Sequence, residues 1–244
     1  MKVDLHNFFL NYDPKNPKHV AAVDELEKVL EKKAPEELDD LANWIRIYRT
    51  KLEPVVPGVL NVPYFPQTDN YRDASRTCNS SSCAMCLEFL KPGTLKGAKG
   101  DDAYIQKVFA VGDTTNHDVQ TRVLKDYGVT SEFRYNLGFS DLDRELAAGR
   151  PVVIGILHRG TLSAPTGGHM VVVIGKKGAD YVVNDPYGSL NDGYTGAVLN
   201  GKGAVYKKSE LAQRWLDHGK DKTDRKSTRL YSSHVSESRM PSSA

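Results

Sequence analysis

The spacing of hydrophobic residues changes along the chain from helical to strand-like. Up to about residue 150, apolar side chains recur at three- and four-residue steps, as on one face of a helix. Beyond that point, short β-branched runs at 152–157, 170–174 and 181–183 have the length of strands. This order predicts an α+β fold, with N-terminal helices followed by an antiparallel sheet.

Residues 1–55 are predicted to be a separate helical N-terminal segment. Asn16 and Pro17 are a good helix start, because asparagine caps a helix and proline suits its first position. A second helix fits residues 35–52. Two such helices bury little on their own, so we expect them to cover the following domain, with a targeting module as the alternative.

Two prolines and a glycine at 53–58 mark the start of the next predicted domain, residues 59–218. After an extended stretch, a helix capped by Asn79 or Ser80 is expected to run to Leu90. Further helices are predicted over 101–110, 116–127, a short stretch ending at Gly149 with Ser140 and Asp143 as a capping box, and 209–218.

The tail, residues 221–244, is rich in Ser, Arg and Lys and has few apolar residues, so we expect it to be disordered. It also resembles the peptide obtained when a sequencing adaptor is translated at the end of a gene. Removing its five basic and three acidic residues from totals of 33 and 31 leaves 28 of each. The remaining chain is neutral, which gives no argument for binding nucleic acid.

No run of residues approaches the roughly 18 apolar positions of a membrane span. The N-terminus lacks the apolar core of a secretory signal, so we expect synthesis in the cytoplasm and no membrane partner. Release to a cell wall would then require lysis or carriage in a virion. Three cysteines is an odd number, and three reduced thiols are the simplest expectation.

Cys78 is the candidate nucleophile, because it precedes an apolar helix and is flanked by polar residues. The positive end of the helix dipole and the unpaired N–H groups there favour a thiolate over a thiol. Cys83 and Cys86 lie within the apolar helix, where we expect them to pack rather than react.

The spacing of the three cysteines also occurs in plant-type iron–sulfur proteins, which need a fourth cysteine that this chain lacks. A zinc site with a histidine as fourth ligand would require Cys83 and Cys86 to leave the apolar helix. We therefore expect neither a metal nor another cofactor.

His169 opens one strand of a predicted hairpin and Asp185 closes the other. A three-residue loop at 176–178 would place the two residues directly opposite one another on one face. A four-residue loop would turn Asp185 to the other face, and a buried histidine paired with an aspartate is also a common structural feature. His158 is the competing base and ranks second, because no acidic residue has a comparable register.

Acyl transfer needs hydrogen-bond donors for the developing oxyanion. The backbone N–H of Cys78 is one candidate, and the side-chain amide of Gln67 is another. Four further residues close to Gln67 are candidates for the substrate cleft: Tyr64, Asp69, Tyr71 and Arg72.

Taken together, these segments resemble cysteine peptidase family thirty-nine, papain-like enzymes related to the bacteriocin-processing, double-glycine-leader peptidases. The resemblance covers roughly residues 59–215. It rests on these motifs: Val62-Pro63-Tyr64-Phe65-Pro66-Gln67, Cys78-Asn79-x-Ser81-Ser82-x-Ala84-Met85, Gly149-Arg150-Pro151-Val152-Val153, Gly168-His169 and Asn184-Asp185-Pro186.

The resemblance implies a papain-like α+β fold with Cys78 as nucleophile, His169 as base, Asp185 as orienting acid and Gln67 as oxyanion donor. Free-standing members of bacteria and phages imply a peptide or peptidoglycan substrate, and the N-terminal helices resemble modules of phage wall hydrolases. We therefore expect a cysteine peptidase or amidase that works through an acyl-enzyme, with the oligomeric state left open. The alternatives are a non-catalytic binding module on the same fold and a transglutaminase-like acyl transferase.

Overall fold

The computed structural model describes residues 16–19, 21–22, 25, 58–97, 99–135, 137–216 and 227–231. Most of the predicted segment 1–55, including its second helix, lies outside the described residues. Within it, the Asn16 side chain accepts the backbone N–H of Lys18 at 3.0 Å, which is the N-cap contact expected there. No helix among the described residues is long and apolar enough to cross a membrane.

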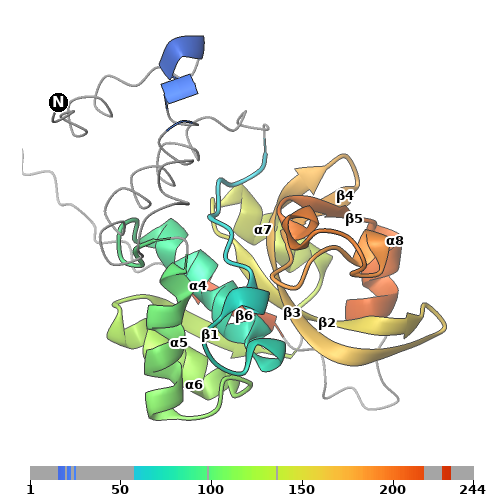
Figure 1. The fold of residues 1–244 in the computed structure, drawn as a ribbon. Coiled ribbons are helices and arrows are strands. Elements are labelled where there is room, and N and C mark those ends of the chain that lie inside the picture. The colour runs from blue at the N-terminus through green and yellow to red at the C-terminus, as the bar shows by residue number, and fades with distance from the viewer. Residues whose placement is uncertain are drawn as a thin grey trace, which may run out of the picture.

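Three helices form one layer of the domain (Figure 1): α4 (Cys78–Leu90), α5 (Gly100–Val111) and α6 (His117–Asp126). The prediction that Asn79 or Ser80 caps α4 is wrong, because the helix begins at Cys78 and both residues are buried inside it. Their side chains make other contacts instead: Asn79 contacts His117, the first residue of α6, and Ser80 contacts Thr114 in the turn before α6.

Within the described residues, the sheet has six strands in the order β1-β6-β2-β3-β4-β5, and each neighbouring pair is antiparallel. The predicted strands appear as the longer strands β2 (Val152–Thr161), β3 (Ala164–Lys177) and β4 (Asp180–Asn184). The outer parts of β2 and β3 form a long hairpin that projects from the sheet (Figure 1), named here the β2–β3 arm, residues 158–167. The remaining strands are β1 (Thr130–Arg134), β5 (Ala204–Tyr206) and β6 (Ser227–Tyr231).

Strand β6 corrects part of the disorder predicted for residues 221–244. Its main chain pairs with β1 on one side and with Val152–Ile154 of β2 on the other. Main-chain hydrogen bonds to two strand edges need few apolar side chains, so composition did not indicate this strand. The rest of the tail lies outside the described residues.

The remaining helices are short and lie on the other face of the sheet or in connecting segments. They are α7 (Phe139–Ala147), α8 (Lys208–Leu211), the π-helix η6 (Ala212–Leu216), and four 3₁₀ turns: η2 (Gln67–Asp69), η3 (Ala74–Arg76), η4 (Leu190–Asp192) and η5 (Val198–Gly201). The predicted capping residues of α7 are wrong: Asp141, not Asp143, accepts the backbone N–H of Gly138. Asp143 binds Lys176 and Tyr181 instead.

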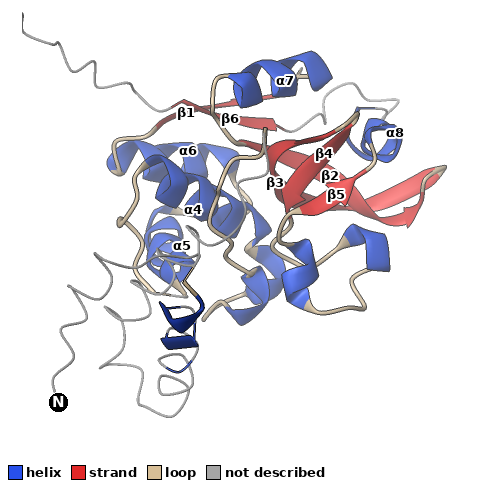
Figure 2. Cartoon of the chain, turned by 90° about the horizontal axis from the view of Figure 1, so that it is seen from above, coloured by secondary structure: helices blue, strands red, loops and turns tan. Residues whose placement is uncertain are grey.

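The sheet carries a hydrophobic core on each face (Figure 2). Val172 packs with α4, α5 and α6, whereas Val171 and Val173 pack against the side that carries Trp215. Burial on both faces explains why β3 is a nearly continuous apolar run. The prediction of an α+β fold with an antiparallel sheet is confirmed.

Candidate active site

Cys78 is the first residue of α4, and its side chain is half-buried. The His169 side chain and the backbone N–H groups of Met170 and Asn79 act on the pKa of its thiol. Burial alone would raise the pKa of the thiol, but the hydrogen bond and charge of His169 and these two N–H groups bring the pKa below its ordinary value. The site therefore favours a thiolate at Cys78.

A buried polar network fixes the N-terminal turn of α4 next to the thiol. Asn70 Nδ2 donates to Thr77 Oγ1 at 2.8 Å and to Ser81 Oγ at 2.9 Å. Ser81 Oγ in turn donates to Asp101 Oδ2 at 2.7 Å. The polar residues around Cys78 thus hold the helix terminus in place rather than contact solvent.

The other two cysteines differ from Cys78. Cys83 and Cys86 are fully buried, and burial raises the pKa of Cys83 to about 12 and that of Cys86 well above its ordinary value. Both belong to the hydrophobic core around α4 and lie near Tyr104 of α5. Within the described part of the chain, no cluster of His, Cys, Asp or Glu side chains is arranged to hold a metal ion.

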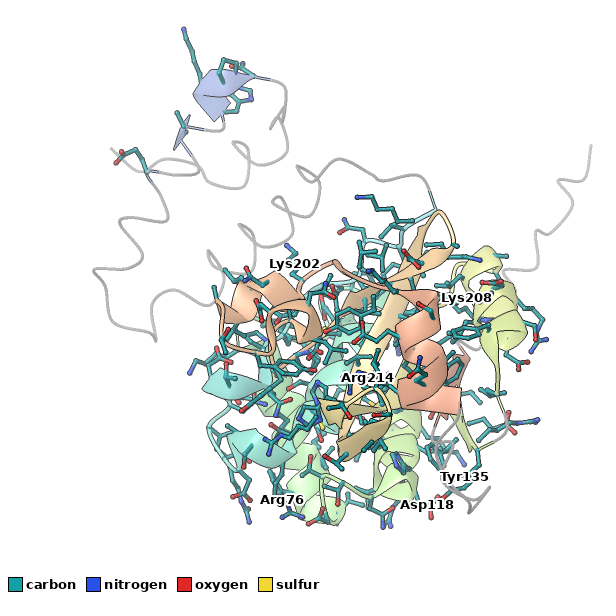
Figure 3. All side chains as sticks on the ribbon, turned by 90° about the vertical axis from the view of Figure 1, so that its right-hand side faces the viewer. Arg76, Asp118, Tyr135, Lys202, Lys208 and Arg214 are labelled. Atoms are coloured by element: carbon teal, nitrogen blue, oxygen red, sulfur yellow. The ribbon has the colours of Figure 1, made fainter. Side chains whose placement is uncertain are left out.

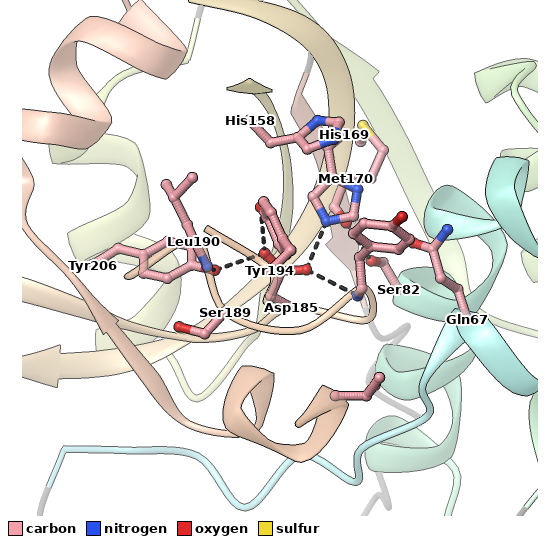
Figure 4. A network of polar contacts seen from close by, with 12 residues as sticks. Gln67, Ser82, His158, His169, Met170, Asp185, Ser189, Leu190, Tyr194 and Tyr206 are labelled. Carbon is pink, nitrogen blue, oxygen red and sulfur yellow. Dashed lines mark hydrogen bonds and ion pairs between the residues drawn. The ribbon is translucent and has the colours of Figure 1, made fainter. Parts of the chain in front are cut away.

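His169 and Asp185 meet at 2.6 Å between Nε2 and Oδ1 (Figure 4), but not through the predicted hairpin loop. Lys177 pairs with Asp180, so the turn has two residues, and a β-bulge lies between Val173 and Gly175. Without the bulge, the turn register would place Asp185 on the face opposite to His169. The bulge adds one residue and returns both side chains to one face.

The Asp185 carboxylate is buried and accepts four hydrogen bonds (Figure 4). Oδ1 accepts from His169 and from the backbone N–H of Tyr187, while Oδ2 accepts from the hydroxyls of Tyr194 at 3.1 Å and Tyr206 at 2.6 Å. Burial would raise its pKa, but the charge of His169 and these donors hold the pKa below its ordinary value. Asp185 is therefore a carboxylate.

The charge of Asp185 sets the protonation state of His169. Burial would lower the pKa of the imidazole, but the Asp185 carboxylate and the contact with Cys78 raise it to about 10. Because Nε2 is bound to Asp185, the other ring nitrogen is left for the thiol. The three side chains form a thiolate–imidazolium–carboxylate chain.

His158, the competing base, lies beside His169 with 4.8 Å between ring centroids (Figure 4). Its Nδ1 is 2.7 Å from the carbonyl oxygen of Gly167 and must donate to it. Its Nε2 accepts from Arg159 Nε at 3.1 Å, so the ring is neutral. Burial and the charge of His169 lower its pKa to about 4. Neither nitrogen is available to a thiol.

Gln67 is buried at the start of η2, and its backbone N–H donates to the carbonyl oxygen of Pro186, next to Asp185. Its side-chain Nε2 donates to the carbonyl oxygen of Ala74 at 2.7 Å. An amide nitrogen has two protons, so one donor of Gln67 is left for a ligand.

Of the four residues predicted to line the substrate cleft, one anchors the loop of Asp185 and three are exposed. The Tyr64 hydroxyl binds the carbonyl oxygens of Asp185 and Val198 at 2.7 and 2.8 Å, and so anchors the loop that carries Asp185. The other three are exposed: Asp69 accepts Lys99 through its carbonyl oxygen, the backbone of Tyr71 donates to Asp102, and Arg72 covers the ring of Phe109.

Sequence reasoning missed two residues of the site, Tyr194 and Tyr206. Both donate to Asp185, and Tyr194 has a left-handed backbone with φ 62°. The ring of Tyr194 also packs 5.4 Å from that of His158 and 6.1 Å from that of His169. They belong to the irregular segment after β4 and to β5, where no periodicity or motif indicates a partner for Asp185.

The site combines a thiol at a helix start with an imidazole and a carboxylate on a sheet. Residues 59–223 match the model of the Peptidase_C39 like family, and the chain belongs to that family. Membership of this family suggests a cysteine peptidase.

The solved structures that are similar to this chain include two peptidases. One is a C39-like peptidase from Bacillus anthracis, 14% identical, with a TM-score of 0.48 over 71% of this chain and 96% of that chain. The other is a double glycine motif protease from an AMS/PCAT transporter in complex with the leader peptide, 17% identical, with a TM-score of 0.42 over 72% of this chain and 96% of that chain. No curated protein matches the chain.

Proposed function

We propose that the protein is a cysteine peptidase or amidase that cleaves an amide bond through an acyl-enzyme on Cys78. The observation that carries the proposal is the chain of contacts from Cys78 through His169 to Asp185, in which each pKa shift favours the ionised form. A lowered thiol pKa beside a raised imidazole pKa is the arrangement that supplies a nucleophile and a proton donor together.

In this reaction, the Cys78 sulfur attacks the carbonyl carbon of the amide and forms a carbon–sulfur bond. The carbonyl oxygen gains negative charge, which the backbone N–H of Cys78 and the free amide donor of Gln67 would stabilise. His169 gives its proton to the leaving nitrogen as the carbon–nitrogen bond breaks. Water, deprotonated by His169, then attacks the thioester carbon, the carbon–sulfur bond breaks, and the carboxylic acid leaves the Cys78 thiolate beside the His169 imidazolium.

Asp185 keeps the ring of His169 in the orientation that serves both proton transfers, because it binds Nε2 and leaves the other nitrogen to the thiol. Tyr194 and Tyr206 hold the carboxylate itself in place. In this proposal the peptide or peptidoglycan stem peptide lies over the start of α4, where Cys78 and Gln67 meet the end of the sheet.

The test compares wild type with Cys78→Ala on purified peptidoglycan and on a denatured protein, while new amino groups are followed. Cys83→Ala is the matched control, because it removes a thiol that the proposal gives no role. Release by wild type and by Cys83→Ala, but not by Cys78→Ala, is expected on one of the substrates. The same traces from all three proteins on both substrates would leave a binding module as the better description.

A second arm of the experiment adds an excess of a primary amine. Mass spectrometry then shows whether the acyl group ends on water or on the amine. A product that carries only the amine would favour a transglutaminase-like acyl transferase over a peptidase.

A further inference from the structure

Arg159 stands out among the arginines of the structure, because no carboxylate in the described residues neutralises it. Six others with described side chains have an acidic partner: Arg72, Arg76, Arg134, Arg144, Arg150 and Arg214. In the described part of the chain, Arg122 shares this property with Arg159, but it lies on α6. Arg159 lies on the β2–β3 arm, one residue from His158.

The guanidinium of Arg159 is held next to the imidazole pair. Its Nε donates to His158 Nε2 at 3.1 Å, and the His158 ring lies 4.8 Å from the His169 ring. Arginine has five N–H donors in a planar fork, and this contact uses one of them. The two Nη groups keep four donors, which is the geometry that binds a carboxylate through two parallel hydrogen bonds.

The backbone of Arg159 is fixed by contacts on both sides. Buried Arg214 lies beside the arm (Figure 3) and donates to the carbonyl oxygens of Leu157 at 2.7 Å and of Arg159 at 3.2 Å. Gly167, with φ +72°, gives the Arg159 side chain room to pass, because a Cβ there would lie 3.2 Å from its Cγ and Cδ. The arm therefore presents the guanidinium from a defined position.

The place of Arg159 relative to the cleaved amide bond follows from the role of His169. The nitrogen that leaves the amide must receive its proton from His169, so the leaving segment of a substrate begins beside that ring. One extended residue spans about 3.3–3.6 Å, so the first two residues after the broken bond can reach from His169 past His158. We propose that Arg159 is a substrate-binding residue that recognises a carboxylate on the leaving side, within two residues of the cleaved bond.

This inference rests on the proposed function and specifies its substrate class: peptides with an acidic residue, or a free terminal carboxylate, directly after the cleaved amide. The two sources share the carboxylate, and the Arg159 fork accepts either one. His158 is a positioning residue in this scheme, because its neutral ring offers the acceptor that orients Arg159.

The test uses iodoacetyl amides, which alkylate Cys78 by displacement of iodide and place their amide substituent where a leaving segment would lie. N-iodoacetylglutamine amide is neutral, the α-amide of N-iodoacetylglutamate carries a side-chain carboxylate, and N-iodoacetylglutamine carries an α-carboxylate. Alkylation of Cys78 is followed by mass spectrometry of the peptide that contains it. In each variant, the rate with an acidic probe is divided by the rate with the neutral probe, which corrects for changes in thiol reactivity.

Wild type should prefer at least one acidic probe by about tenfold, the value expected for one charge-assisted contact. Arg159→Gln should lose the preference, and Arg159→Lys should keep part of it, because lysine keeps the charge without the fork. Arg122→Gln is the matched control and should keep the full preference. No preference in wild type, or an undiminished preference in Arg159→Gln, would overturn the assignment.

The probes report binding without amide hydrolysis, so the two proposals can fail separately. A preference that depends on Arg159, found in a protein that cleaves no amide, would refute the peptidase and keep the carboxylate site. Amide cleavage that requires Cys78, with equal rates for the three probes, would refute the carboxylate site and keep the peptidase. The two acidic probes show which source of carboxylate the site takes.

Discussion

His169 and Asp185 bind one another at 2.6 Å although they are not directly opposite in their hairpin. The pairing Val172↔Asn184 places Asp185 beyond the last pair of β4, diagonal to His169 by two positions. A diagonal pair on one face of a sheet remains within reach of long side chains. The β-bulge beside Gly175 therefore decides whether the imidazole has a carboxylate partner at all.

The first prediction concerns the charge of Asp185. Asp185→Asn keeps the shape of the side chain but removes the charge that raises the pKa of His169 to about 10. Burial then lowers the pKa of His169, so less imidazolium is present at neutral pH and the thiolate loses its counter-charge. Iodoacetamide alkylation of Cys78 at pH 7 should slow by about tenfold or more, and its pH profile should move toward that of an ordinary thiol.

Asp143→Asn is the control for this prediction, because Asp143 binds Lys176 and Tyr181 on the other side of the sheet from α4. Its alkylation profile from pH 5 to 10 should follow wild type. An Asp185→Asn profile that coincides with wild type would show that the carboxylate does not set the charge of His169.

The second prediction concerns the selectivity among thiols. Cys78 is half-buried with a lowered pKa, whereas Cys83 and Cys86 are fully buried with raised pKa values. In the folded protein near pH 7, iodoacetamide should label Cys78 at least tenfold faster than either of the others. Peptide mapping after short exposures measures the three rates. In denaturant the three rates should become similar, and equal rates already in the folded protein would contradict an activated Cys78.

The main features of the fold and site followed from local patterns in the sequence. The apolar helix after Cys78 and the β-branched run along β3 depend on neighbouring residues, so they predicted α4 and the hairpin. The helix predicted over 116–127 is α6, which spans His117–Asp126 and has Asn116 as its N-cap. The family resemblance added the order of the motifs, and the family match bears it out over residues 59–223.

What could not be predicted depends on contacts between distant segments. The Lys-Lys-Gly turn was expected to have three residues, but the close approach of Val59 to Gly175 accompanies a bulge that no local pattern indicates. The hydroxyls of Tyr194 and Tyr206 donate hydrogen bonds to Asp185 from an irregular segment and from β5, and neither has a sequence pattern that indicates this contact. The neutral state of His158 was also hidden, because it depends on Arg159 passing over Gly167.

The third prediction concerns Gly201, which lies against the loop of Asp185. A Cβ at this position would lie 2.2 Å from the carbonyl oxygen of Asp185, 2.4 Å from that of Gly188 and 2.8 Å from the Tyr64 hydroxyl. Two of these neighbours are backbone atoms, so Gly201→Ala must displace the main chain that carries Asp185. Overpacking of this kind costs about 1–3 kcal/mol of unfolding free energy.

Gly201→Ala should therefore lower the melting temperature and also slow the alkylation of Cys78, because Asp185 moves relative to His169. Gly138→Ala is the control, since no atom lies within 4 Å of the Cβ it would add. Equal melting temperatures for the two variants would show that the Asp185 loop accommodates the extra methyl group.

The last prediction is a pH dependence of stability that comes from Asp101. Its carboxyl is buried, and burial raises its pKa to about 7, although Ser81 donates to Oδ2. Its Oδ1 is buried without a hydrogen-bond partner among the described residues. In the unfolded chain the pKa is about 3.9, so between pH 4 and 7 the folded protein holds a proton that the unfolded chain releases. The free energy of unfolding contributed by Asp101 therefore falls as the pH rises through this window.

Asp101→Asn should remove this dependence, because asparagine does not titrate. The unfolding free energy of the variant minus that of wild type should rise from pH 4 to about 7 and then level off, with a total change on the order of 4 kcal/mol, and the difference in melting temperature should follow it. The prediction concerns the variant minus wild type, and not the pH curve of either protein alone. His158, with its pKa lowered to about 4, makes the stability of both proteins rise with pH in this window, and the subtraction removes that shared effect. Exposed Asp118, changed to Asn, should show no such rise. A flat difference for Asp101→Asn would mean that the carboxyl ionises without cost, and that the polar network under Cys78 tolerates a buried charge.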